Sequence, residues 1–174
     1  MILVAVAVPS EADTPQVEGF SVGIVFDDLV GTTQVGARAS YWWQYVGVDI
    51  SLHANNYWFD VSDDFYTETL IEQSQGYFGL GVKAGAQIDR AKLHALLGFG
   101  GFVEEGGAFE VDTTLGTFDF GLGVDFAVSE HFVIGLNFLD VRVYSGVIGD
   151  DIGSVDLDGV AVRFLQGGHV SFQF

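Results

Sequence analysis

The sequence has 174 residues, of which 24 are Asp or Glu and only 6 are Lys or Arg, so its formal net charge at pH 7 is −18. So few cations argue against nucleic-acid binding, which needs Lys and Arg to neutralise phosphates, and the absence of Cys excludes disulfides and thiolate metal sites. Although 49% of the residues are hydrophobic, no run of about 18 apolar residues occurs, which excludes membrane-spanning helices.

The chain begins with an apolar run, MILVAVAV, followed by PSEA. This run resembles the end of a signal-peptide hydrophobic region with small residues near a cleavage point, but it is short and has no basic segment before it. The other interpretation is a mobile N-terminal tail. Both interpretations place residues 1–17 outside the fold and leave 18–174 as one domain, long enough for roughly eight strands.

Apolar residues alternate with small or polar residues through most of this domain. In 46–55 (VGVDISLHAN) every second side chain is apolar, and Asp49 lies among the others. A period of two indicates extended strands, because helical spacing would scatter the two sets around a cylinder. In chain order the predicted strands are 19–26, 33–41, 46–55, 76–88, 91–103, 117–128, 132–143 and 158–174.

The connections between the predicted strands alternate between short and long. Short turns are predicted at 43–45, 89–90 and 129–131. Longer loops are predicted at 27–32, 58–75, 104–114 and 145–157. This arrangement predicts an all-β fold, an eight-stranded antiparallel up-and-down transmembrane β-barrel. In the seventh strand the alternation shifts by one residue near Leu139 and Asp140, which predicts a β-bulge.

Two features predict that the apolar face points outward. The interior of an eight-stranded barrel is just wide enough for side chains, and the apolar face carries too many Phe, Leu and Ile to fit there, whereas the other face is rich in Gly and Ser. Four of the six cations, Arg38, Lys83, Lys92 and Arg163, also fall on that other face, whereas Arg90 lies in a turn. Each would cost ~2–4 kcal/mol facing lipid at the middle of a bilayer. The predicted lumen charge network is Arg38, Asp49, Lys83, Lys92, Asp119, Asp125 and Arg163, joined by Arg142 if the bulge exists.

Aromatic residues collect at the strand ends, as they do in the girdles at membrane interfaces. The predicted girdle has two parts. Near the turns it contains Phe20, Tyr41, Trp43, Tyr45, Phe126, Phe132, Phe172 and Phe174. Toward the loops it contains Phe26, Tyr57, Trp58, Phe102 and Phe118.

The last strand alternates as far as the final residue, Phe174. A terminal strand that ends on an aromatic resembles the C-terminal signal of outer-membrane β-barrel proteins. With the architecture, it makes residues 18–174 similar to the small eight-stranded barrels of the OmpA and OmpX transmembrane type, with OmpW-like proteins nearby. The resemblance implies a monomer in the outer membrane of a Gram-negative bacterium. Its implied partners are outer-membrane lipids, lipopolysaccharide and the barrel-assembly machinery, which reads Phe174.

Three functions stay open at this point. The luminal charges predict a salt-bridge plug, and therefore a structural or surface-interaction barrel with acidic extracellular loops. The alternative is a narrow channel for small solutes or cations, as the OmpW resemblance implies. The second alternative is a hydrolase, because His169 and Ser171 resemble the His-x-Ser of PagL-type lipid A deacylases, in which His activates Ser. Only three residues follow Ser171, so no acid lies downstream to orient the His.

The sequence contains two groups of residues that could ligate a metal ion. His53, His94 and His169 share the inner face, although a hydrogen-bonded core histidine is the ordinary outcome. The loop carboxylates suit divalent cations such as Ca²⁺ or Mg²⁺, but no EF-hand-like spacing appears. We therefore predict no cofactor, no resident metal and no enzymatic activity. The acidic loop residues are Asp60, Asp63, Asp64, Glu68, Glu72, Glu104, Glu105, Asp150, Asp151, Asp156 and Asp158.

Overall fold

The computed structural model describes residues 14–29, 32–63, 66–106, 112–149 and 153–174; the side chains at 27–29, 32–33, 55–63, 66–73 and 166 lie outside that description. Eight strands pair in sequence order and close into one antiparallel barrel, which confirms the predicted fold class and topology. Within the described ranges, no helix is long and apolar enough to cross a membrane. The strands are β1 (Gly19–Leu29), β2 (Thr32–Trp42), β3 (Val46–Asp63), β4 (Tyr66–Ile88), β5 (Ala91–Gly106), β6 (Asp112–Ala127), β7 (Phe132–Gly149) and β8 (Ser154–Gln173).

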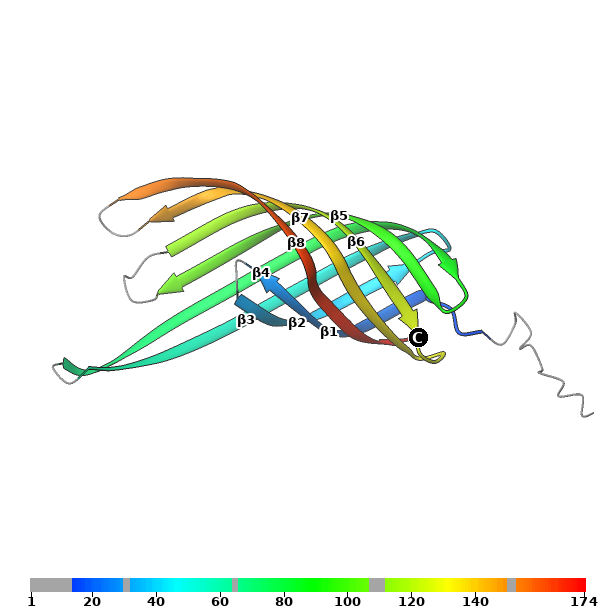
Figure 1. The fold of residues 1–174 in the computed structure, drawn as a ribbon, viewed down its shortest axis with the longest axis horizontal. Helices are drawn as coiled ribbons and strands as arrows, with labels where there is room; N and C mark the ends of the chain where they lie inside the picture. The colour runs from blue at the N-terminus through cyan, green and yellow to red at the C-terminus, as the bar shows by residue number, and fades with distance from the viewer. Residues whose placement is uncertain (1–13, 30–31, 64–65, 107–111, 150–152) are drawn as a thin grey trace, which may run out of the picture.

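The short connections β2–β3, β4–β5 and β6–β7 lie at one end of the barrel, which we call the turn side (Figure 1). The tightest is the two-residue turn after Ile88, where Asp89 takes the left-handed conformation with φ of 53°, a region that Asp tolerates better than most residues. The C-terminus reaches the same end, because Phe174 N donates to Phe20 O at 2.9 Å. The opposite end is called the loop side.

The predicted loops are too long, because the strands continue into them. β3 and β4 stay paired from Val46↔Ala84 to Asp63↔Tyr66, so most of the predicted loop 58–75 is a hairpin. The predicted loops 104–114 and 145–157 likewise contain the ends of β5 to β8. Strands were predicted from strict alternation of apolar and polar residues. These segments are rich in Asp and Glu and do not alternate strictly, so the sequence predicted loops there.

The bulge predicted near Leu139 and Asp140 exists one residue earlier. Leu122 pairs with Leu139 and Gly123 pairs with Asn137, so Phe138 is the extra residue of β7. The shift turns Arg142 into the barrel, where its side chain is buried.

A second irregularity lies in β8 and was not predicted. β7 pairs Asn137 with Gly167 but Leu139 with Phe164, and Leu165 has φ of 53°. Alternation with Ala161 and Arg163 predicts that the Leu165 side chain faces the lumen, yet it is 71% exposed. This prediction is wrong because the bulge turns the Leu165 side chain outward. The alternation of inward and outward residues resumes at Gly167.

The two faces of the barrel wall differ sharply in chemistry. Large apolar side chains cover the outside, including Ile50, Leu97 and Phe120, whereas the residues buried inside are mostly polar or charged. Among the described side chains, the largest that are fully buried are Lys92, Asp125, Gln34 and Phe102. The barrel therefore has its apolar surface outside and its polar core inside.

Apolar clusters lie inside the barrel toward each end. On the turn side, Val17 packs with Trp42, Ala127 and Val133, so a residue that the sequence placed in the tail belongs to the packed structure. On the loop side, Tyr77, Phe102 and Leu115 form a second cluster, against which Tyr144 and Leu157 pack. Phe102 was predicted for the outer girdle; this prediction was wrong, because Phe102 has the same parity as the luminal residues of β5 and is 1% exposed.

Candidate functional site

The centre of the lumen contains a three-residue ion cluster from β2, β3 and β4. The strand register pairs Asp49 with Ser40 on one side and with Gly81 on the other. Because both direct neighbours are small, the diagonal neighbours Arg38 and Lys83 reach the carboxylate. Arg38 Nη2 and Lys83 Nζ each lie 2.5 Å from Asp49 Oδ2, and all three side chains are largely buried.

A second ion cluster lies on β6 and β7, where Asp119 and Arg142 are direct cross-strand partners. Asp119 Oδ1 accepts a hydrogen bond from Arg142 Nε. Its other oxygen accepts from the hydroxyl of Tyr77 at 3.0 Å and from that of Thr117 at 3.3 Å.

Farther around the wall, Asp140 and Arg163 are also cross-strand partners. Arg163 Nη2 lies 2.6 Å from Asp140 Oδ2. The bulge at Phe138 turns both Asp140 and Arg142 into the lumen. Asp140 pairs with Arg163, and Arg142 pairs with Asp119 in the second cluster.

Asp125 forms a third group, nearer the turn side. Its Oδ2 accepts from Trp42 Nε1 at 3.2 Å, while His169 Nε2 lies 3.5 Å from Oδ1 and His94 Nδ1 lies 3.9 Å from Oδ2. Gly135 makes this grouping possible, because an added Cβ there would overlap the His169 ring and approach Asp125.

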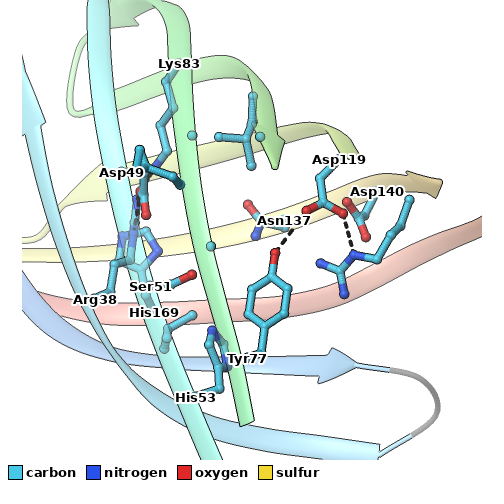
Figure 2. Close-up of a pocket in the computed structure, with 17 residues that line it drawn as sticks. Arg38, Asp49, Ser51, His53, Tyr77, Lys83, Asp119, Asn137, Asp140 and His169 are labelled. Carbon is cyan, nitrogen blue, oxygen red and sulfur yellow. Dashed lines mark hydrogen bonds and ion pairs between the residues drawn. The ribbon is translucent and has the colours of Figure 1, made fainter. Parts of the chain in front are cut away.

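A cavity of about 80 Å³ separates the first two clusters, and Figure 2 shows Asp49 and Asp119 on either side of it. It is lined by charged and polar side chains such as Arg38, His53 and Tyr77 and by luminal glycines. At about 30 Å³ of liquid volume per water, this volume corresponds to roughly two or three waters. Among the described residues, no group of three or more His, Asp or Glu side chains is arranged to hold a metal ion.

A closed eight-stranded barrel with an apolar exterior and a charged interior is the arrangement expected of a protein whose solvent is lipid. A family model described as an outer membrane protein beta-barrel domain matches residues 2–164 of the chain. The chain belongs to this family. None of the curated proteins compared with the chain matches it. The family and the closed barrel together make it a small outer-membrane β-barrel protein, as its resemblance implied.

The structure brings most of the predicted charge network together in the lumen of this outer-membrane barrel. Arg38, Asp49 and Lys83 share one cluster, Asp119 lies in the second, and Asp125 lies near the histidines. Arg163 meets Asp140, which the sequence interpretation used only to mark the bulge.

Lys92 is the exception in the predicted network. Its ammonium donates to the carbonyl of Val17 at 2.5 Å and lies 4.5 Å from the centre of the Trp42 ring. The glutamine Gln87 accepts from the backbone N–H of Val17, at 3.4 Å. Lys92 therefore holds the N-terminal segment at the turn-side end of the lumen. The alternation of the sequence did not predict this contact.

Apart from Phe102, the predicted girdle residues with described side chains lie on the outside of the barrel. Rings of the turn side touch one another, as in the pairs Tyr41–Trp43 and Phe172–Phe174, whose centroids lie 4.7 and 5.0 Å apart. The side chain of Trp58 lies outside the described residues. The exposed members are Tyr41, Trp43, Tyr45, Phe126, Phe132, Phe172 and Phe174.

His169 and Ser171, the pair that resembles a hydrolase motif, are both buried in the lumen, and Ser171 is only 2% exposed. An acidic partner does exist in space, because Asp125 of β6 faces His169. A lipid substrate outside the barrel nevertheless meets the opposite face of β8, which carries Val170 and Phe172.

Proposed function

We propose that this outer-membrane barrel is a non-enzymatic, non-conducting protein, and that its lumen is plugged by its own side chains. The observation that carries the proposal is the pair of apolar clusters at the two ends of the charged lumen. Between Val17–Trp42 on the turn side and Tyr77–Phe102 on the loop side, the cavity at the ion clusters has a volume of about 80 Å³. Eight strands leave room for side chains rather than for a continuous water column.

The proposed task of the protein is structural or surface interaction through its acidic loop side. Glu104, Glu105, Asp156 and Asp158 lie on the loop-side parts of β5 and β8, and Glu105, Asp156 and Asp158 are exposed. Asp64, Asp150 and Asp151, and the side chains of Asp60, Asp63, Glu68 and Glu72, lie outside the described residues. Acidic residues in this number support attraction of cations and basic partners. Divalent cations and lipopolysaccharide are the partners that we propose.

We further propose a monomer in a Gram-negative envelope, which is assembled through its C-terminal strand. Phe174 is 71% exposed and its ring packs beside Phe172 and Phe20. An exposed aromatic at the end of the closing strand is accessible to assembly factors before β8 pairs with β1.

Single-channel recording in planar bilayers tests the plug. Wild-type protein that shows heat-modifiable gel mobility, and is therefore folded, is expected to give no conductance steps. A variant that trims both apolar clusters, Trp42→Ala with Phe102→Ala, is expected to conduct if it keeps the mobility shift. Asp158→Asn, an exposed change outside the lumen, serves as the silent control.

The alternative is a narrow channel, which the polar cavity between the two ion clusters favours. Stable cation-selective steps in the wild type, altered by Asp49→Ala or Lys83→Ala, would replace the plug by this function.

A further inference from the structure

The barrel wall is incomplete on the loop side, above the β1–β2 hairpin. β1 pairs with β8 only from Ser21↔Gln173 to Asp27↔Gly167, although β8 begins at Ser154. In Figure 1 the β1–β2 hairpin ends well short of the other strands. In the part of the chain that the structure describes, residues 154–162 of β8 therefore pair with β7 on one side and with no strand on the other.

A similar edge exists on β3. The pairing of β2 with β3 ends at Gly36↔His53, whereas β3 continues to Asp63. Across 54–63, β3 pairs with β4 alone in the described structure. The two edges flank the short hairpin, so among the described residues the loop-side sheet is an open sheet formed by the six strands β3 to β8.

Of the features that usually protect an edge strand, residues 154–162 of β8 have charged side chains, Asp156 and Asp158, but no Lys and no Pro. Nine residues of extended chain present roughly 30 Å of backbone donors and acceptors. Natural edges are blunted by charged side chains, by Pro, by bulges or by a covering segment. The β8 bulge lies on the turn side of residues 154–162, at Leu165. The two Asp side chains therefore leave this edge open to a strand that neutralises their charge. Such an edge is a template for strand addition.

The charge around this edge selects the partner. The loop-side stretches 27–37, 54–82, 99–118 and 143–162 contain Asp and Glu but no Lys or Arg. On the edge itself, Asp156 and Asp158 are exposed on the same face as Val160 and Val162. A partner strand with cationic side chains at alternating positions complements this acidic surface.

A second copy of the chain fits this edge poorly. Copies in one membrane have the same orientation, so two β8 strands would run parallel, and parallel pairing is slightly less stable per residue than antiparallel pairing. β8 against the β3 edge of a neighbour would run antiparallel, but both edges are acidic in sequence and like charges across a sheet are destabilising.

We propose that residues 154–162 of β8 dock an extended, basic segment of another polypeptide, which adds to the sheet as an antiparallel strand. Backbone hydrogen bonds provide the affinity, and Lys or Arg side chains facing Asp156 and Asp158 provide the selectivity. This inference rests on the surface-interaction role proposed above and names the class of partner.

The test uses three ten-residue fluorescent peptides and the full chain in nanodiscs of neutral phosphatidylcholine, with binding followed by fluorescence anisotropy. The first peptide alternates Lys and Val. The second has the same sequence but is N-methylated at every other residue, which removes backbone donors and leaves the charge unchanged. The third alternates Glu and Val. We expect the first to bind, the second to bind about tenfold or more weakly, and the third not to bind.

Two matched variants locate the site. Asp156→Asn with Asp158→Asn removes two charges from the β8 edge, and Glu105→Gln with Asp112→Asn removes two exposed charges from β5 and β6. The first pair is expected to weaken binding about fivefold and the second to leave it nearly unchanged.

Equal binding of the methylated peptide, or equal effects of the two variant pairs, would overturn the inference in favour of diffuse electrostatic attraction. Absence of binding to the first peptide would also overturn it. The two proposals fail separately. If the wild-type barrel does not conduct and binds no peptide, the docking edge is refuted and the plug stands. If the barrel conducts and binds the first peptide, the plug is refuted and the docking edge stands.

Discussion

Removal of Asp119 from the second ion cluster is the most informative single perturbation of the lumen. Asp119 is 5% exposed and accepts hydrogen bonds from Arg142, Tyr77 and Thr117. Breaking a buried ion pair by removing one partner costs ~3–5 kcal/mol, because the remaining charge stays desolvated. Asp119→Ala is therefore expected to lower the free energy of unfolding by about 4 kcal/mol, most of it through the lost Arg142 contact.

A double replacement separates charge from packing. Asp119→Leu with Arg142→Met removes both charges and fills the space with apolar atoms. Replacing a whole buried pair in this way is often neutral, so the double variant is expected to be more stable than Asp119→Ala alone.

The assay is reversible urea unfolding in lipid vesicles, followed by Trp fluorescence and by heat-modifiable gel mobility. The exposed change Asp158→Ala serves as the control and is expected to stay within ~0.5 kcal/mol of the wild type. A loss below about 1 kcal/mol for Asp119→Ala, or a double variant less stable than the single one, would refute the view that this carboxylate neutralises Arg142.

Three further predictions concern the wall of the barrel and its assembly. Gly135→Ala places a Cβ against His169 and Asp125 and should cost ~1–3 kcal/mol in urea unfolding; Gly153→Ala, where the added atom meets open space, should cost almost nothing, and equal effects would contradict the tight packing. Leu97→Arg on the lipid-facing side of β5 should destabilise the barrel by ~2–4 kcal/mol more than Leu97→Ala in vesicle unfolding; a tolerated Arg would speak against lipid contact there. Phe174→Ala should slow accumulation of folded protein in cells, measured by pulse-chase and gel mobility, while refolding in detergent stays unchanged; unchanged assembly in cells would remove its role as a signal.

Most of the barrel was predictable because each membrane-crossing strand has two environments, lipid and lumen, and so must alternate. The parity shift near Leu139 revealed the β7 bulge for the same reason. The β8 bulge at Leu165 causes no parity shift in the sequence pattern. The inward-facing residues of β8 are odd-numbered both before the bulge and again from Gly167, so alternation alone could not reveal it. The outer parts of β3 and β4 were predicted to be loop, because their acidic sequence does not alternate.

The chemistry of the lumen was predictable, but its partners were not. Alternation assigned Arg38, Asp49 and Lys83 to one face, yet only the register shows that Asp49 serves both cations. The apolar ends of the lumen were missed because Phe102 was assigned to the girdle, although its parity placed it inside, and because Val17 precedes the first alternating segment.

The central claim is that the apolar face of the wall meets lipid and the charged face meets the lumen. Neighbouring tryptophans of β2 and its turn test it directly, because Trp42 is 3% exposed inside the barrel whereas Trp43 is 55% exposed outside. Single-tryptophan variants, with the other tryptophans replaced by Phe, are folded into vesicles of brominated phosphatidylcholine. The account predicts strong quenching of Trp43 and little quenching of Trp42; strong quenching of Trp42 with a protected Trp43 would contradict it.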